Sequence, residues 1–405
     1  MIEYESGGLL GGLGVLTQLS GSVFPRVLPY GLWASALTIL IHFTAREYFS
    51  LETLAHPYAH QVFAISVGFL LVFRSNLSYQ RFWEGLSNVQ QMSTKWDDAC
   101  LQLVAFEEAE NEPDGQRFKF CAIHLFCLLH ASAIQHLRDD FDLNHLVENT
   151  PDRVLPKGWF AQTHEHADKS TRSYLEVIGG ISPSEKLALE NVEERAYTIM
   201  AWIVRVMTRR HKFSAGLKVP PPILSRTFHV LSEGMSSYMQ ARKVRDTPFP
   251  FPYAQLVMTV LIIFVSTAPC VVVAYVEDMG MAVALAFLSS CAGAALNEVA
   301  KEIEDPFGFD PNDLPLGRLH AQFVLRISSL RATDLQILEA ESFFDEIIPP
   351  TKEELDRKVT YFGNDGDLFD VNCTRGGHGH SDLTLAAASP PEDHSDWGPG
   401  FTPAV

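Results

Sequence analysis

The stretch VFAISVGFLLVFRSNLSYQRFWE, from Val62 to Glu84, decides the fold of this chain. Its first half is apolar enough for a membrane, and the sequence turns polar at Arg74. No proline or glycine separates Phe73 from Glu84, so nothing breaks a helix at this junction. We therefore expect one helix that runs from the hydrocarbon of a bilayer into water.

Three large apolar side chains, Ile65, Phe69 and Phe73, recur in this stretch at positions i, i+4 and i+8. This spacing places them on one face of a helix. Two interpretations are open: the face lines a pore, or it packs against a neighbouring helix. Periodicity alone favours packing, because stripes of large apolar residues usually form helix contacts. Ala64 and Gly68 lie on another face, where such a small pair allows a helix to approach closely.

Four runs without Asp, Glu, Lys or Arg are long enough to cross a bilayer as helices. They are Val27–Ala45, Leu54–Phe73, Tyr253–Val276 and Met279–Leu296, with 19, 20, 24 and 18 residues. The second run is the least hydrophobic, as expected for a pore-lining helix that meets lipid with only part of its surface. The sequence therefore predicts an all-α membrane protein with four transmembrane helices.

The remaining sequence is polar and is divided by these spans. Four spans place both termini on one side, together with nearly all Lys and Arg, and this asymmetry identifies that side as cytosolic. The end of the chain is rich in Gly, Pro, Asp and Ser, which predicts disorder. The expected organisation is an irregular segment at 1–22, the first two spans at 23–84, a cytosolic helical region at 85–250, the last two spans at 251–297, a second cytosolic helical region at 298–362 and a disordered tail at 363–405.

Amphipathic patterns predict several helices inside the first cytosolic region. Two of them cover Gln90–Phe106 and Phe118–Leu137. Another begins after Ser182, because Ser-Pro-Ser-Glu supplies an N-cap, a proline in the first turn and a glutamate at the third helical position. We expect this helix to run to about Lys212. A further helix follows the triple proline, at Ile223–Val244.

The composition and the absence of catalytic motifs argue against several function classes. With 31 basic and 49 acidic residues the net charge is −18, which argues against nucleic acid as a partner. The six cysteines form no CxxC pair, so neither a disulfide framework nor a zinc site is expected. No nucleotide-binding loop, nucleophile elbow or HExxH helix is present, and we expect neither an enzyme nor a cofactor.

Two arginines follow the apolar stripe, and each allows two interpretations. Arg74 and Arg81 are seven residues apart and therefore share a helix face just past the junction. They either attract anions into a vestibule or pair with nearby acids such as Glu84, Asp97 and Asp98. The sequence favours neither alternative.

An acidic group after the fourth span suggests a metal site. Asp310 and Asp313, near Glu302, Glu304 and Asp305, are candidate oxygen ligands for calcium. The EF-hand spacing and its last glutamate are absent. Aspartates beside proline and leucine also cap turns and helix starts, and the spacing favours that structural role.

Three segments carry a resemblance to a known family. FRSNLSYQRFWEG (Phe73–Gly85), IEDPFGFDPNDLPL (Ile303–Leu316) and TPFPFPYAQLV (Thr247–Val257) resemble signature segments of the bestrophin-like anion channels, most closely those of the bacterial, plant and algal branch. With four spans and a long soluble insert, the resemblance extends from about Ser20 to Phe362.

The resemblance implies a homopentamer around one axial pore. It maps the family's three hydrophobic neck residues onto Ile65, Phe69 and Phe73, which reverses the preference for simple packing. It also implies a cytosolic aperture near the start of the helix before TPFPFPY, for which Ile223 is the candidate. Animal members bind calcium through a dense acidic run, which prolines and Asn312 interrupt here, so the resemblance does not extend to calcium gating.

The expected function is passive conduction of chloride, and also bicarbonate, through the pentameric pore in a lipid bilayer. Photosynthetic relatives reside in plastid membranes, so the thylakoid and the plasma membrane are both possible locations. The alternative is a membrane-anchored helical scaffold, in which the large cytosolic region recruits partners and the spans serve only as an anchor.

Overall fold

Helices make up most of the chain in the computed structural model, which describes Leu19 and residues 21–44, 58–107, 113–149, 174–213 and 216–330. Most of the predicted segment 1–22, the end of the region 298–362 and the tail 363–405 lie outside the described residues. The helices are α2 (Phe24–Thr44), α3 (Tyr58–Ala105), α4 (Pro113–Leu137), α7 (Pro183–Glu190), α8 (Arg195–Phe213), α9 (Pro221–Asp246), α10 (Phe251–Tyr275) and α11 (Met279–Glu304). Residues 316–330 are also helical.

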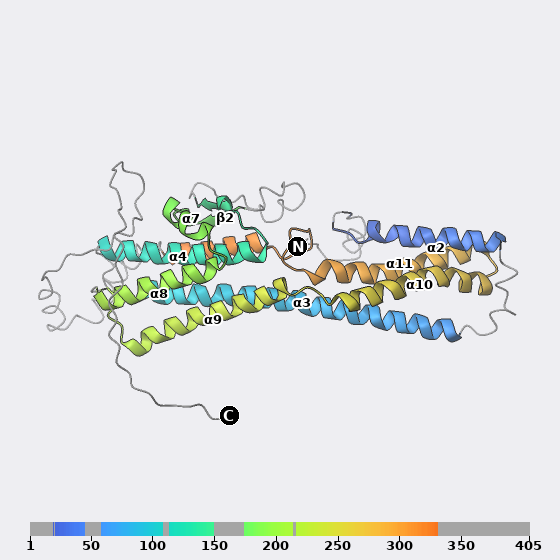
Figure 1. Ribbon diagram of the computed structural model, residues 1–405, viewed down its shortest axis with the longest axis horizontal. Helices are drawn as coiled ribbons and strands as arrows, with labels where there is room; N and C mark the ends of the chain where they lie inside the picture. The colour runs from blue at the N-terminus through green and yellow to red at the C-terminus, as the bar shows by residue number, and fades with distance from the viewer. Residues whose placement is uncertain are drawn as a thin grey trace, which may run out of the picture. The chain divides into compact units, whose positions relative to one another are not determined.

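Helix α3 confirms the prediction of one continuous helix across the junction. It extends for 48 residues, from Tyr58 to Ala105, and contains no proline. Its first part packs with α2, α10 and α11 around a small core that includes Ala34, Val67 and Leu261. Its second part packs with α4 and α9 in a larger core (Figure 1). We call these two groups of helices the membrane bundle and the soluble bundle, and α3 belongs to both.

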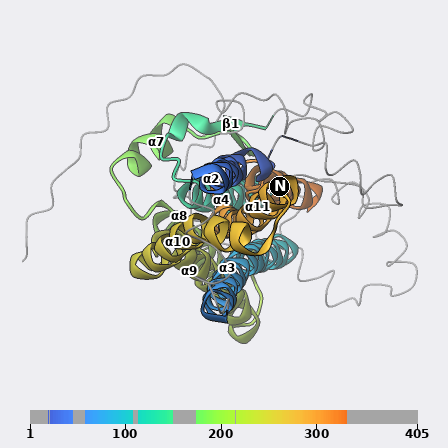
Figure 2. The ribbon, with the colours of Figure 1, turned by 90° about the vertical axis from the view of Figure 1, so that its right-hand side faces the viewer.

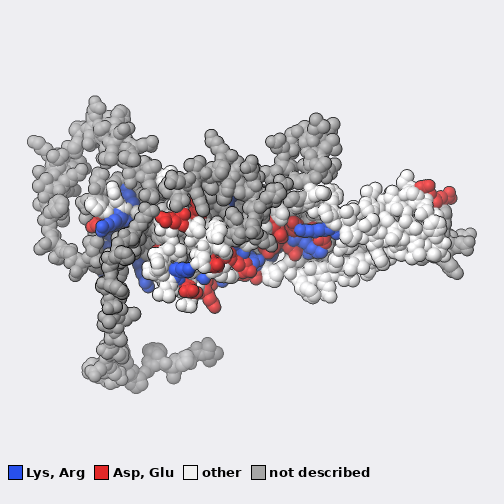
Figure 3. Space-filling model, turned by 90° about the horizontal axis from the view of Figure 1, so that it is seen from above, with Lys and Arg blue, Asp and Glu red and all other residues white. Residues whose placement is uncertain are grey.

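The surface separates in the same way. In the view of Figure 3, charged side chains gather over one part of the described surface, while another part is uncharged except near its end. Viewed along the long axis of Figure 1, α2, α10, α11 and α3 lie side by side (Figure 2). An uncharged outer surface over a bundle of long helices is the pattern expected of a bundle that meets lipid.

Helix α4 is a fifth helix that is long and apolar enough to cross a membrane. Its apolar window is 83% buried inside the chain, whereas the windows of the four predicted spans are only 22–33% buried. A helix covered on nearly every side by protein has no surface left for lipid. We therefore assign α4 to the centre of the soluble bundle, and four membrane-spanning helices remain among the described residues.

A chain of hydrogen bonds between buried side chains ties four elements of the soluble bundle together. His130 Nδ1 lies 2.9 Å from His320 Nδ1, His130 Nε2 lies 2.7 Å from Ser93 Oγ, and His320 Nε2 lies 2.7 Å from the Glu176 carbonyl oxygen. The carbonyl can only accept, so His320 Nε2 carries a proton and its Nδ1 accepts from His130. His130 Nε2 then accepts from the Ser93 hydroxyl, whose single hydrogen also lies within reach of the Val89 carbonyl (3.0 Å). With both imidazoles neutral, every ring nitrogen has a partner.

Two features of the soluble bundle differ from the sequence prediction. The helix expected from Ser182 to about Lys212 is two helices, α7 and α8, separated by residues 191–194. The capping box at Ser182 and Glu185 is confirmed, but Asn191 caps the end of α7 and Arg195 Nε donates to the Leu189 carbonyl (3.1 Å). A side chain therefore satisfies a carbonyl at the helix end, and the helix stops there.

The second difference is a small sheet. Strands β1 (Leu146–Glu148) and β2 (Leu175–Val177) pair in parallel, with Leu146 opposite Leu175. Each strand has three residues, which is too short for a periodic signal in the sequence. The 3-10 helix η1 (Leu143–His145) precedes β1 and is capped by Asp142.

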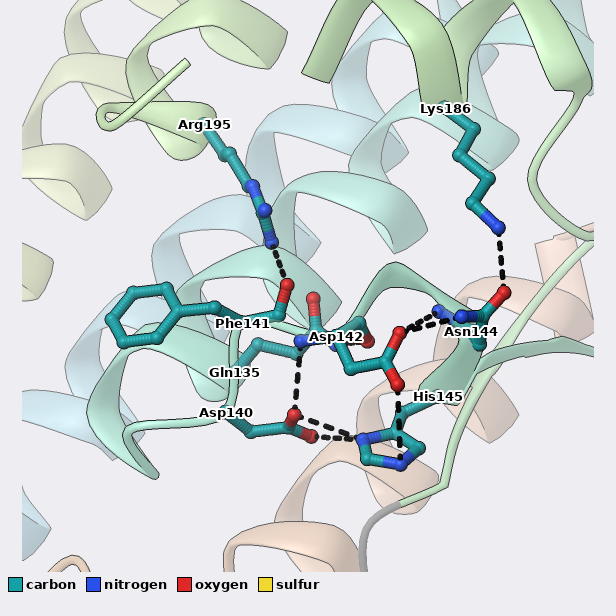
Figure 4. A network of polar contacts seen from close by, with 8 residues as sticks. All are labelled: Gln135, Asp140, Phe141, Asp142, Asn144, His145, Lys186 and Arg195. Atoms are coloured by element: carbon teal, nitrogen blue, oxygen red, sulfur yellow. Dashed lines mark hydrogen bonds and ion pairs between the residues drawn. The ribbon is translucent and has the colours of Figure 1, made fainter. Parts of the chain in front are cut away.

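A polar network fixes η1 against the soluble bundle. Arg195 of α8 donates to the Phe141 carbonyl (2.9 Å), and Lys186 of α7 donates to Asn144 (2.5 Å). Gln135 of α4 donates to the Asp142 carbonyl (2.8 Å). Figure 4 shows these bonds converging on one turn from three helices. The network positions the sheet and does not form part of the membrane bundle.

Candidate pore face and junction

The apolar stripe of Ile65, Phe69 and Phe73 lies on the outer face of α3. Ile65 is 72% exposed, Phe69 71% and Phe73 44%. The opposite face, with Val67 and Leu71, is buried in the membrane bundle. Ile65 and Phe69 therefore project away from the other helices of their own chain, and Phe73 does so in part.

The ring contacts of the stripe are few. Phe69 and Phe73 stack with their centroids 6.4 Å apart, and Phe73 meets Tyr253 of α10 edge to face at 6.1 Å. Packing against a neighbouring helix, the alternative left open by the periodicity, does not occur for Ile65 and Phe69 within the described chain. Gly68 also has open space where a Cβ would stand, with no atom within 4 Å, so no described helix of the same chain approaches this glycine closely.

Arg74 lies at the junction and is buried, with 2% of its surface exposed. Its Nη1 donates to Asn297 Oδ1 (2.6 Å) and its Nη2 to Glu304 Oε2 (2.9 Å), both on α11. Its guanidinium also lies over the ring of Phe249, 5.4 Å from the centroid. A buried arginine is tolerated when its charge is paired, its N–H groups are hydrogen-bonded and its plane lies over an aromatic ring, and Arg74 has all three kinds of contact.

Arg81 bonds to three backbone carbonyls. Its Nε donates to Glu304 (3.1 Å), and its Nη2 donates to Val244 (2.8 Å) and Thr247 (2.9 Å). The last two carbonyls belong to the end of α9 and the turn after it, where helix carbonyls lack partners within the helix. The contacts of Arg74 and Arg81 favour the pairing alternative for both, although the partners are none of the acids that the sequence suggested.

The second signature segment packs against the first. Phe307 is fully buried, and a Cβ added at Gly85 would lie 2.9 Å from its ring. A larger residue at position 85 would displace this ring, because a Cβ needs more room. Because Phe73 also meets Tyr253 and Arg74 lies over Phe249, all three signature segments are in contact. Asn297, Phe249 and Phe307, which help to fix the geometry here, were not among the predicted site residues, and Glu304, predicted only as part of an acidic group, pairs with Arg74.

The calcium candidates form a turn. Asp313 is buried, and its Oδ2 accepts from the Asp310 backbone N–H (2.7 Å). Burial, together with neighbouring Asp310, Asp305 and Glu302, raises the pKa of Asp313 to about 7, although the bond from Asp310 acts in the opposite direction. Among the described residues, no group of three or more His, Cys, Asp or Glu is arranged to hold a metal ion. The geometry is that of a turn cap.

Ile223, the candidate for the cytosolic aperture, lies in the first turn of α9. Its side chain is 46% exposed, and the neighbouring Leu224 is buried. The helix begins with Pro221 after Pro220, so the triple proline fixes where the first turn starts. An apolar side chain at this position is held by a rigid segment and points away from the core.

Comparison with known proteins places the chain in a family. The model of the family described as Bacterial/Fungal Bestrophin protein matches residues 10–328. A voltage-dependent anion channel-forming protein of Nostoc sp. is 22% identical over 298 residues, which cover 73% of this chain and 82% of the relative. A protein of the same description from Synechocystis sp. is 23% identical over 257 residues, 63% of this chain and 71% of the relative.

Solved structures share the fold. A crystal structure of a bacterial bestrophin homolog from Klebsiella pneumoniae, which carries one mutation, superposes with a TM-score of 0.58 at 17% sequence identity. The match covers 76% of this chain and 99% of that one.

Proposed function

Because the chain belongs to the bacterial and fungal bestrophin family, we propose that it is a passive anion channel formed by five copies around one pore. The permeant ions of the proposal are chloride and bicarbonate. The membrane is a plastid thylakoid or a plasma membrane, and immunolocalisation distinguishes the two.

One observation carries the proposal: an aligned stripe of large apolar side chains is exposed on the single chain. Ile65 and Phe69 are each more than two-thirds exposed, while the opposite face of the same helix is buried. Five copies of this stripe around an axis form a narrow apolar neck, and such a neck gates by dewetting. The rings of Phe69 and Phe73 can also turn electropositive edges towards a passing anion.

The proposal gives other residues smaller roles. Ile223, exposed at the start of α9, forms the second constriction. Asp310 and Asp313 hold a turn and do not sense calcium. Arg74 and Arg81 hold the junction together rather than offering free charge to the ion.

Recording from purified protein in planar bilayers tests the proposal. Under a chloride gradient the reversal potential should follow the chloride equilibrium potential, and a bicarbonate gradient should be followed in the same way. A reversal potential that follows the cation contradicts it. A monomer in mild detergent also contradicts it and favours the scaffold alternative, because one chain cannot enclose a pore.

A pair of matched variants tests the neck. Phe69→Ala should widen the neck and raise the leak conductance. Phe43→Ala is the control, because Phe43 is also an exposed membrane phenylalanine (73%) but lies on α2. Equal conductance in the two variants would mean that the Phe69 face meets lipid or another subunit instead.

A further inference from the structure

The face of α3 that carries the neck residues does not end at the junction. Steps of 3.6 residues from Phe69 lead, beyond Phe73, to four polar residues, Asn76, Gln80, Ser87 and Gln91, with Trp83 between them, and all five are exposed. Because α3 is one helix without proline as far as Ala105, these four positions continue the neck face beyond the membrane. They span roughly 20 Å along the helix axis at 1.5 Å per residue. We call these four residues the polar strip.

The polar strip consists of neutral hydrogen-bond donors. Asn and Gln each present two N–H groups, and Ser presents one O–H. None of the four side chains has a hydrogen bond with any residue that the structure describes. By contrast, Thr94, the next position on this face, donates its hydroxyl to the Gln90 carbonyl (2.9 Å). The donors of the polar strip are therefore unused by the fold of the single chain.

Charged groups beside the polar strip are neutralised by α9. Glu84 pairs with Lys243 (2.7 Å), and Lys95 pairs with Glu233 (2.7 Å). The two arginines at the junction are bonded to α11 and to backbone carbonyls, as described above. An anion that leaves the neck along this face therefore meets neutral donors first, and Asp98 is the first charged residue on the face itself.

We infer, on the basis of the channel proposed above, that the polar strip lines the path below the neck and solvates the permeating anion. Amide N–H and hydroxyl groups replace part of the hydration shell that the anion loses in the apolar neck. Neutral donors bind an anion weakly enough to release it, whereas a ring of free arginines would hold it. The polar strip rather than Arg74 and Arg81 then favours anions over cations.

Charge substitutions on the reconstituted full chain test this inference with chloride as the permeant ion. Gln80→Glu and Gln91→Glu each place a ring of five carboxylates on the path. Each should lower chloride conductance by about tenfold, the lower end of the effect of a single-sign lining on local ion concentration. The reversal potential should move towards that of the cation. Gln116→Glu is the matched control, since Gln116 is an exposed helical glutamine on α4, and it should behave as wild type.

Gln80→Leu tests the donor role without adding charge. It should lower chloride conductance, and it should do so at unchanged oligomer size. Unchanged conductance and reversal potential in the Glu variants, with a conducting wild type, would overturn the inference and leave the proposed channel intact. Loss of assembly in all three strip variants would also overturn it, because the strip would then be a subunit contact. A wild type that does not conduct chloride overturns the channel itself.

Discussion

The two halves of α3 both bury apolar side chains, but the membrane half also exposes a stripe of them. In the soluble bundle the buried residues are apolar, and Val89, Met92 and Trp96 are all fully buried. In the membrane bundle Ile65 and Phe69 stand exposed. The two halves therefore follow different rules, because water surrounds the soluble half but not the membrane half. The exposure of an apolar side chain therefore indicates its role only when the medium around that part of the helix is known.

The largest loss of stability is expected when Arg74, at the boundary between the two halves of α3, is replaced. Arg74→Ala leaves Asn297, which is fully buried, and Glu304 without the guanidinium. Removing one partner of a buried charged pair costs roughly 3 to 5 kcal/mol. Thermal unfolding in detergent measures this loss as a fall in Tm. Arg74→Lys should fall between wild type and Arg74→Ala, because lysine keeps the charge but cannot form both bonds. A loss below about 1 kcal/mol would show that Arg74 does not hold α3 to α11.

Acid should destabilise the soluble bundle through His320. Burial, with a smaller contribution from Arg138, lowers the pKa of His320 from 6.5 to about 4, although the bond to Glu176 acts in the opposite direction. The unfolded chain therefore binds a proton that the folded chain excludes. Stability from this group is constant above about pH 6.5 and falls by about 3 kcal/mol as the pH decreases to 4.

The measurement compares stability against pH for wild type and His320→Gln. The difference between the two curves is needed, because the raised pKa of Asp313 contributes a slope of opposite sign to both. His320→Gln should flatten the dependence between pH 6.5 and 4. His229→Gln is the control, since the His229 side chain is 73% exposed. Parallel curves for wild type and His320→Gln would contradict the assignment.

Helix packing in the two bundles should respond differently to one added methyl group. A Cβ at Gly234 of α9 would lie 2.4 Å from the ring of Trp96, whereas a Cβ at Gly68 meets no atom within 4 Å. Gly234→Ala should cost about 1 to 3 kcal/mol by overpacking. Gly68→Ala should change stability by no more than about 1 kcal/mol. If Gly68→Ala instead disrupts the oligomer, then a second subunit approaches this face.

Much of this architecture could be predicted from the sequence, because length and charge define a membrane span without reference to its neighbours. The continuous helix through Phe73 and the stripe at Ile65 and Phe69 followed from periodicity. The partners of Arg74 did not, because Asn297 and Glu304 are more than 200 residues away in sequence and only the folded chain brings them together. The break after Glu190 was missed because it depends on one side chain, Arg195, that bonds a carbonyl.

The smallest effect should come from an exposed ion pair on the soluble half of α3. Lys243 and Glu84 are 2.7 Å apart, but their side chains are 57% and 44% exposed. Water solvates both charges when the pair breaks, so Lys243→Ala should cost less than about 1 kcal/mol, and less still at high salt. The contrast with Arg74→Ala separates burial from charge, since both variants remove one basic residue bonded to a glutamate. Equal losses of stability in the two variants would mean that burial does not determine how much these ion pairs contribute.

Lys243→Ala also leaves Glu84 unpaired beside Gln80, so any fall in chloride conductance at unchanged stability would arise from the freed carboxylate near the polar strip.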